Sequence, residues 1–308
     1  MSIDITTAIL MTVVGASTPI LLAALGELVV EKAGVLNLGI EGMMLLGAVS
    51  AFAVTVTTGS PLLGAMAAML AGVAGSMIFG YLALTLTSSQ VATGLALTIF
   101  GIGASSLFGA PFVGQTVDGL GPVFPAALAD HTVLRLVFGH DPLVYISVAL
   151  TVATVWFLNR SRAGLILRAV GESDSAAHSI GYPVIVVRYL AVAFGGAMAG
   201  LGGAYFSLVL TPLWADQLTA GRGWIALALV VFSSWRPWRL FLGAYLFGGV
   251  MTLELHAKAA GIGFLEPEFL AMLPYLATIV VLTAISLGPR VASRGAPACL
   301  GKPFRAST

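Results

Sequence analysis

Long apolar runs without charge are the feature that most constrains how this chain folds. Only 9% of its 308 residues are charged, whereas a soluble domain carries roughly 25%. A helix of about 20 apolar residues crosses the hydrocarbon core of a bilayer. We therefore expect an all-α, polytopic membrane protein, a helical bundle of about nine transmembrane helices. The nine runs cover residues 5–25, 35–57, 61–86, 91–109, 142–158, 186–210, 223–235, 240–255 and 269–287.

Clustered cations predict the orientation of the chain in the membrane. Short loops rich in Lys and Arg stay in the cytoplasm, and counting the runs places three clusters on one face and segment 110–141 on the other. This predicts an external N-terminus and a cytoplasmic C-terminus. The net charge of +1 provides no basic field for nucleic acid. The clusters are Arg160, Arg162, Arg168 and Arg188; Arg236 and Arg239; and Arg290, Arg294, Lys302 and Arg305.

Small residues recur every four positions within three of the apolar runs. Such ridges allow transmembrane helices to approach one another closely. We therefore expect a tightly packed bundle. The three ridges are Ala68, Gly72, Ser76 and Gly80; Gly101, Ser105 and Gly109; and Gly195, Ala199, Gly203 and Ser207.

Two further patterns concern the shorter runs. The seventh and eighth runs are short for a simple span, which favours helices shielded by neighbours or broken at membrane depth. The segment Leu95–Phe100 is similar to Leu227–Phe232, and the predicted topology gives the two segments opposite directions. This indicates either an inverted repeat, as in transporters, or a chance similarity.

The segment 26–44 places polar residues at the head of an apolar run. Asn37 and Glu41 lie four positions apart, on one face of a helix, and glycines at 34, 39 and 42 loosen that helix. A carboxylate inside a membrane is costly and usually faces protein or water. One interpretation is a broken helix that lines a pathway or sets its gate. The other is a span that begins only at Met43 and leaves Glu41 wet at the interface.

The segment 168–181 is polar yet compact. Ser173 is a suitable N-cap, small helix-forming residues follow it, and Gly181 is a suitable C-cap. We expect a short surface helix between two spans. Its Ala and Gly residues favour a docking element for a cytoplasmic partner, and an ordinary connecting helix is the alternative.

Motifs for catalysis, nucleotide binding and metal binding are missing. Lys302 follows Gly301 but precedes Pro303, so no Walker A loop is present and the chain is not itself an ATPase or another enzyme. The single Cys299 supports neither a disulfide nor a zinc site. The histidines are too scattered for a metal centre; they are His131, His140, His178 and His256. We therefore predict no catalytic residue, no metal site and no cofactor bound by this chain.

The stretch from Glu31 to Gly47 resembles the signature of one branch of ABC importer permeases. It reads Glu-Lys-Ala-Gly-Val-Leu-Asn-Leu-Gly-Ile-Glu-Gly-Met-Met-Leu-Leu-Gly. This branch comprises the nucleoside and purine permeases related to the ribose and branched-chain amino acid permeases. Segments in the same order along nearly the whole chain support the resemblance: 168–172, 221–229, 235–237 and 300–304.

The resemblance implies a permease with the fold of the vitamin B12 importer, in a bacterial inner membrane. Its transmembrane domain would cover residues 1–287, with a coupling loop at about 159–188, and a cytoplasmic tail would cover 288–308. The implied partners are a second, homologous permease, a cytoplasmic ATP-binding subunit, often with two fused ATPase domains, and an extracytoplasmic substrate-binding lipoprotein. ATP and magnesium would be bound by the ATP-binding subunit.

The family's cytoplasmic docking motif has the sense E-A-A-x-x-x-G. Ala176, Ala177 and Gly181 match it, whereas Ser175 replaces the acid and Glu172 lies one turn earlier. This departure leaves open which carboxylate, if either, contacts the ATPase. The coupling residues implied here are Gly171, Glu172, Ala176, Ala177 and Gly181.

The implied solute is a nucleoside or purine base, with a sugar-like solute as an alternative. The candidate pathway residues are Asn37, Glu41, Gln90, Thr93 and Trp224, and the Trp224 ring could stack on a base or anchor the chain at the membrane interface. A different class also remains, a secondary transporter in which Glu41 binds a coupling proton or sodium ion. Such a transporter is expected to carry more intramembrane ionisable residues and no docking helix.

Overall fold

The computed structural model describes residues 2–125, 132–259 and 295–305, with five single positions between 272 and 283. Regular structure within these ranges is helical throughout. Apart from those single positions, the predicted ninth run at 269–287 lies outside the described residues. The same is true of Arg290, Arg294 and His131, which entered the sequence analysis.

Six described helices are long and apolar enough to cross a membrane. They overlap the first six predicted runs, although the first continues well beyond residue 25 and the second, predicted from residue 35, begins only at Ile40. They are α1 (Ser2–Lys32), α2 (Ile40–Thr58), α3 (Pro61–Gly80) extended by the π-helical turn η1 (Tyr81–Thr85), α4 (Gln90–Gly109) extended by η2 (Ala110–Phe112), α7 (Pro142–Arg160), and α10 (Val184–Tyr205) extended by the π-helical turn η3 (Phe206–Leu210).

The remaining described helices are shorter or more polar. The seventh run forms α11 (Arg222–Phe232), whose 11 residues extend about 17 Å, roughly half of a hydrocarbon core. Most of α11 is buried, so neighbouring helices shield it. The eighth run lies in α12 (Pro237–Ala259). Three short helices complete the set: α6 (Thr132–Phe138), α8 (Arg162–Glu172) and α9 (Asp174–Ser179).

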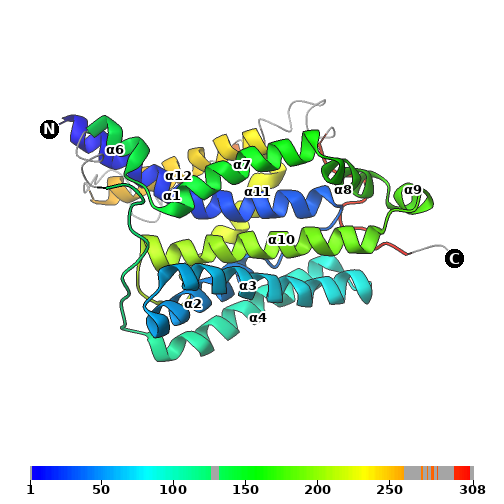
Figure 1. The fold of residues 1–308 in the computed structure, drawn as a ribbon, viewed down its shortest axis with the longest axis horizontal. Helices are drawn as coiled ribbons and strands as arrows, with labels where there is room; N and C mark the ends of the chain where they lie inside the picture. Colours follow the sequence, from blue (N-terminus) through cyan, green and yellow to red (C-terminus); the bar gives the residue numbers. More distant parts are fainter. Residues whose placement is uncertain are drawn as a thin grey trace.

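Helix α10 runs through the middle of the bundle (Figure 1). Helices α2, α3 and α4 lie on one side of it, and α1, α7, α11 and α12 lie on the other. The main core joins α1 to α10, α11 and α12, and the segment of α1 from Ile20 to Val30 is almost fully buried. The helices α8 and α9 and the tail at 295–305 gather at one end of the bundle (Figure 1).

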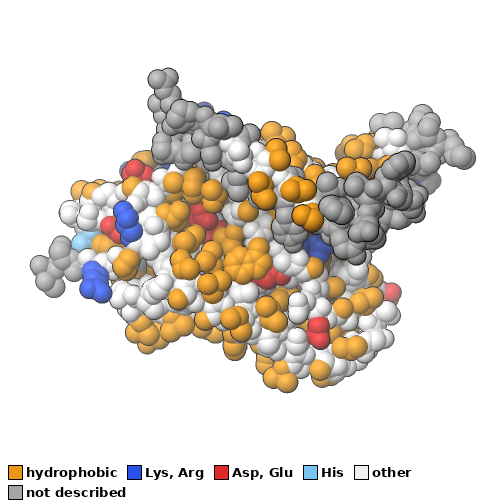
Figure 2. All heavy atoms as spheres, turned by 180° about the vertical axis from the view of Figure 1, so that it is seen from behind, with side chains coloured by type: hydrophobic (Ala, Val, Ile, Leu, Met, Phe, Trp, Pro, Cys, Tyr) orange, Lys and Arg blue, Asp and Glu red, His pale blue; other side chains and the backbone are white. Residues whose placement is uncertain are grey.

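The outer surface is apolar, as a protein in lipid requires. Figure 2 shows hydrophobic side chains over much of one face and few Lys or Arg side chains there. Leu70, Ile99, Leu107 and Leu190 are each at least two-thirds exposed. In water such a surface would drive aggregation, whereas the acyl chains of a bilayer accommodate it.

The small-residue ridges lie where helices touch, which confirms the expected tight packing. A Cβ added to Gly72 of α3 would overlap the carbonyl oxygen of Gly196 on α10. A Cβ on Gly203 of α10 would overlap the carbonyl oxygen of Met44 on α2, and one on Gly101 of α4 would meet the backbone of Gly42. Backbone therefore packs directly on backbone across three helix pairs.

Replacing Gly72 with alanine is expected to destabilise the bundle. The new methyl group would overlap the Gly196 carbonyl oxygen and lie 3.0 Å from the Gly200 nitrogen, and such overpacking costs about 1–3 kcal/mol. Gly103→Ala is the matched control, because nothing lies within 4 Å of the position its Cβ would take. The thermal unfolding midpoint in detergent should fall only for Gly72→Ala. Equal midpoints for the two variants would contradict this packing.

Candidate functional site

The chain leaves helical geometry between the end of α1 at Lys32 and the start of α2 at Ile40. Gly34 has a φ of +85°, a left-handed conformation that favours glycine. Asn37 is buried, and its Oδ1 accepts a hydrogen bond from the Gly39 N–H at 2.9 Å, the local bond of an Asx turn. The break, residues 33–39, therefore lies inside the protein rather than in a surface loop.

Side chains from α1 and α4 satisfy the backbone of the break. The Leu36 N–H donates to Oε1 of Gln90 at 2.8 Å, and the Asn37 N–H donates to Oε1 of Glu27 at 3.1 Å. Non-helical backbone at membrane depth is tolerated only where it is buried in protein or lines a cavity. These contacts meet that condition, and they fix the break to both neighbouring helices.

Glu41 joins the start of α2 to the start of α11. One carboxylate oxygen accepts from the Thr219 hydroxyl and from the Gly221 N–H at 2.9 Å, and the other accepts from the Gly223 N–H at 2.6 Å. The N-termini of both helices favour a negative charge at this position. Glu41 is 5% exposed and lies within α2. The alternative in which the span begins at Met43 and leaves Glu41 in water is therefore wrong.

The five candidate pathway residues have different environments. Asn37, Glu41, Gln90 and Thr93 are buried within the subunit, whereas Trp224 is 38% exposed on the first turn of α11. Thr93 also lines an apolar cavity of about 240 Å³ between α3 and α4. Of these five residues, only Trp224 has a large side chain that reaches the surface of the single subunit. Whether these residues line a pathway stays a prediction.

Two buried carboxylates were missed by the sequence analysis. Glu27 and Glu31 lie one turn apart on α1, each 1% exposed. Glu27 holds the break, and Glu31 accepts a hydrogen bond from Nε1 of Trp235. The predicted first run ended at residue 25 because these acids follow it. One oxygen of each carboxylate accepts a hydrogen bond from a protein donor, so α1 continues through both acids while buried in protein.

A short surface helix occupies the predicted docking segment. Ser173 is its N-cap, with a side chain that accepts from the Ala176 N–H at 3.3 Å. The helix α9 ends at Ser179, Ile180 is the C-cap, and Gly181 follows in a left-handed conformation with φ of +90°. The predicted helix is confirmed, with Gly181 one residue beyond the cap.

The coupling residues of this segment divide into an outer and an inner set. Glu172, Ala176 and Gly181 are exposed, whereas Ala177 and Gly171 are buried. Ala177 belongs to a small core that holds α9 against α8 and α10. A Cβ on Gly171 would overlap the carbonyl oxygen of Lys32, so this glycine lets α8 touch the end of α1.

Arg188 connects the short helix to the break. Its side chain on α10 is 1% exposed, and its Nη2 forms an ion pair with Asp174, the first residue of α9, at 3.0 Å. Its Nε donates to the Ala33 carbonyl at 3.2 Å, and its Nη1 donates to the Lys302 carbonyl at 3.5 Å. One buried guanidinium therefore joins α9, the end of α1 and the C-terminal tail. Its signal in the sequence was a single cation inside an apolar run.

The tail at 295–305 packs back onto this end of the bundle. The Cys299 N–H donates to the Gly171 carbonyl at 2.9 Å, and the Gly301 N–H donates to the Gly34 carbonyl at 3.2 Å. The Phe304 ring lies 5.5 Å from the His178 ring and packs on the small core beneath α9. The tail thus fastens α8 and α9 to the start of the break.

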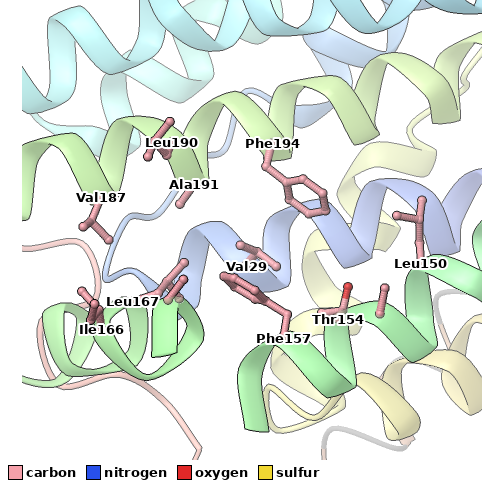
Figure 3. Close-up of a pocket in the computed structure, with 12 residues that line it drawn as sticks. Val29, Leu150, Thr154, Phe157, Ile166, Leu167, Val187, Leu190, Ala191 and Phe194 are labelled. Atoms are coloured by element: carbon pink, nitrogen blue, oxygen red, sulfur yellow. The ribbon is translucent and has the colours of Figure 1, made fainter. Parts of the chain in front are cut away.

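An apolar groove of about 400 Å³ lies between α1, α7, α8 and α10. Figure 3 shows its aliphatic and aromatic side chains directed into the space, with the Thr154 hydroxyl the polar group drawn. Such a lining is unsuited to a polar solute. The groove is lined by Val29, Leu150, Ala153, Thr154, Phe157, Ala163, Ile166, Leu167, Val187, Leu190, Ala191 and Phe194.

Together, these features describe a polytopic helical membrane protein with a buried helix break and a docked surface helix. The chain belongs to the family described as branched-chain amino acid transport system / permease component, which matches residues 9–282. The resemblance in the sequence is thereby confirmed.

Three relatives are ABC transporter permeases by name. A putative glucose ABC transporter permease from Haloferax volcanii is 40% identical, over 88% of this chain and 89% of its own. A guanosine ABC transporter permease from Bacillus subtilis is 30% identical, over 94% and 93%. A nucleoside ABC transporter permease from Lactococcus lactis is 27% identical, over 90% and 92%. This chain is accordingly an ABC transporter permease.

Proposed function

We propose that this chain forms half of the membrane pathway of an ATP-driven importer for a nucleoside or purine base. It pairs with a second, homologous permease and works with a cytoplasmic ATP-binding subunit, of one or two fused ATPase domains, and an extracytoplasmic substrate-binding lipoprotein. ATP and magnesium bind to the ATP-binding subunit. The importer lies in a bacterial inner membrane.

The topology proposed for this function keeps the nine predicted spans. Residues 269–287 form the last span, the N-terminus is external, and the end of the bundle that carries α8, α9 and the tail is cytoplasmic. The transmembrane domain covers residues 1–287 and the tail 288–308, in the fold of the vitamin B12 importer. Support comes from Arg160, Arg162 and Arg168 at that end, because short cytoplasmic loops are rich in Lys and Arg.

The contacts of Arg188 carry the proposed mechanism. When the ATPase dimer closes, it displaces α9, and the Arg188–Asp174 pair transmits this displacement to Ala33 at the start of the break. The break continues into α2, where Glu41 grips the start of α11. Closure of the ATPase dimer would then shift α11 as a rigid body. Trp224, on the first turn of α11, would move with it beside the pathway. Asn37, Gln90 and Thr93 would support the break or line the path.

The contacts of Glu41 weigh against an ion-coupled secondary transporter. Both of its carboxylate oxygens already accept hydrogen bonds from protein donors. Three protein donors fill most of the acceptor sites of this carboxylate, so a coupling proton or sodium ion would have to share it with them or displace them. Glu41 is therefore better suited to holding two helices together than to binding an ion in each cycle.

The names of the relatives support two classes of solute. The two named for guanosine and nucleosides favour a nucleoside, and an exposed Trp224 ring suits stacking on a base. The relative named for glucose has the higher identity, 40%, and favours a sugar as the second candidate. The assembled complex in proteoliposomes separates them: labelled guanosine should be taken up with ATP, and excess unlabelled glucose should not compete. ATP-driven uptake of labelled glucose, without uptake of guanosine, would favour the second candidate.

Replacing Trp224 with leucine is expected to lower guanosine uptake about fivefold or more, because one aromatic stack on a base contributes roughly 1–3 kcal/mol. Trp224→Phe is the matched control, since it keeps an aromatic face at the same position. Uptake by proteoliposomes at a subsaturating guanosine concentration is the measurement. Equal uptake by the leucine and phenylalanine variants would remove Trp224 from the pathway.

Replacing Ala176 with arginine is expected to lower substrate-stimulated ATP hydrolysis about tenfold or more, as loss of a central interface contact does. Ala176 is exposed on α9, so the change should block docking without unfolding the permease. Thr58→Arg, an equally exposed substitution at the end of α2, is the control. Normal stimulation of hydrolysis in the Ala176 variant would contradict docking through α9.

A further inference from the structure

A basic cavity lies at the end of the bundle where α8 joins α7. Its volume is about 520 Å³, and it is distinct from the apolar groove on the other side of α7. Four of its residues are cations, contributed by α1, α8, the start of α12 and the residue before α12: Lys32, Arg168, Arg239 and Arg236. The rest of the lining is Val155, Leu158, Asn159, Trp235, Pro237 and Trp238.

The positive charge of this cavity is not balanced by the described part of the chain. None of the four cations forms an ion pair with a described acid, and the buried Nε of Arg168 has no hydrogen-bond partner there. Lys32 donates to a backbone carbonyl, that of Gly295, at 2.9 Å. The carboxylates whose charge acts on Lys32 are those of Glu31 and Glu172. Even with both ionised, four cations face two anions.

The start of α12 adds donors to the same cavity. Pro237 is the first residue of α12, and the first turn of a helix leaves N–H groups, here those of Trp238 and Arg239, without intrahelical acceptors. A helix N-terminus with neighbouring guanidinium groups is a favourable environment for a phosphate, which arginine binds through paired N–H donors. The cavity thus combines charge, shape and donors suited to a phosphate group.

Exposed apolar side chains extend from the cavity along two packed helices. On α12, Trp238, Leu242 and Leu246 recur every four residues and are 52%, 67% and 46% exposed. On α7, Val152 and Trp156 are 50% and 61% exposed, and α7 packs against α12. A free phosphate ion has no apolar part that could pack on this surface. A lipid would place its acyl chains on it and its head group in the cavity.

We propose that this cavity binds the phosphate of an anionic phospholipid whose acyl chains lie along α12 and α7. Basic pockets between transmembrane helices are known to hold anionic head groups. Lys32 is the last residue of α1, directly before the break, and Arg168 lies on α8, the helix that precedes α9. In the proposed orientation the lipid belongs to the cytoplasmic leaflet.

Native mass spectrometry of the full chain in detergent tests the site with added phosphatidylglycerol and phosphatidylcholine. The double variant Arg236→Gln/Arg239→Gln should bind phosphatidylglycerol about 30-fold more weakly. Each arginine contributes roughly fivefold to the affinity for an anionic lipid, and the two factors multiply. Its affinity for phosphatidylcholine should not change. The control Arg160→Gln/Arg162→Gln removes the same charge from exposed positions outside the cavity and should keep phosphatidylglycerol affinity within about threefold.

Two results would overturn the proposal. An equal loss of phosphatidylglycerol affinity in both double variants would show that the lipid is attracted by the general positive charge of the surface and not by this cavity. Displacement of phosphatidylglycerol by millimolar inorganic phosphate would assign the cavity to a soluble anion. A second measurement uses the unaltered chain: brominated phosphatidylglycerol should quench tryptophan fluorescence more than brominated phosphatidylcholine. Trp238→Phe should reduce this difference, and Trp156→Phe/Trp238→Phe should reduce it further, because both rings lie exposed on the surface assigned to the lipid. Equal quenching by the two lipids would refute the site even if the arginine variants failed to fold.

Discussion

Replacing Arg188 with methionine is expected to abolish coupled transport while the complex still assembles. The change removes the ion pair with Asp174 and the hydrogen bonds to the carbonyls of Ala33 and Lys302. Breaking a buried charged pair costs about 3–5 kcal/mol, so the thermal unfolding midpoint should also fall. ATP hydrolysis should persist at a rate that the substrate no longer stimulates, measured beside uptake in the same proteoliposomes.

Two further variants distinguish coupling from general stability. Asp174→Asn leaves the buried Arg188 charge without its partner and should uncouple hydrolysis from uptake in the same way. Gly72→Ala lowers stability at a packing contact away from Arg188 and should leave the ratio of hydrolysis to uptake unchanged. If Arg188→Met and Gly72→Ala altered that ratio equally, Arg188 would be a structural residue and not a coupling element.

Replacing Glu41 with glutamine is expected to lower transport about tenfold or more without dissociating the complex. The amide keeps one acceptor oxygen and places an NH2 donor against the N–H of either Gly221 or Gly223, and a buried donor left unsatisfied costs about 1–3 kcal/mol. The start of α11 should loosen as a result. ATP-driven uptake by the assembled complex is the measurement, with size-exclusion chromatography to follow assembly.

Thr219→Val is the graded control for Glu41. It removes one neutral donor to the carboxylate and leaves both backbone N–H groups in place, so its effect should be several-fold smaller. Full activity of Glu41→Gln would contradict the contact between α2 and α11.

Local sequence patterns were enough to predict much of the fold. Uncharged runs located the six described helices that are long and apolar enough to cross a membrane, because a helix satisfies its own backbone in lipid. Glycines at Gly72, Gly101 and Gly203 marked helix contacts because a side chain at these positions would collide with a neighbour. Ser173 and Gly181 identified α9, since a cap and a left-handed residue act within one turn.

The contacts that organise the candidate site could not be predicted in this way. Arg188 meets Ala33 across 155 positions of the chain, and Trp235 meets Glu31 across 204. A single sequence has no local signal for such pairs. The acids on α1 therefore looked like the end of a span, although distant donors let the helix continue to Lys32. The role of the tail was missed for the same reason.

Uptake by sealed proteoliposomes tests the central claim most directly. This chain should be reconstituted with its paired permease, with and without the ATP-binding subunit, and supplied with the binding lipoprotein and labelled guanosine or glucose. Accumulation should require both the ATP-binding subunit and hydrolysable ATP. Accumulation by the permease chain alone, driven by an ion gradient and unaffected by nucleotide, would contradict the account.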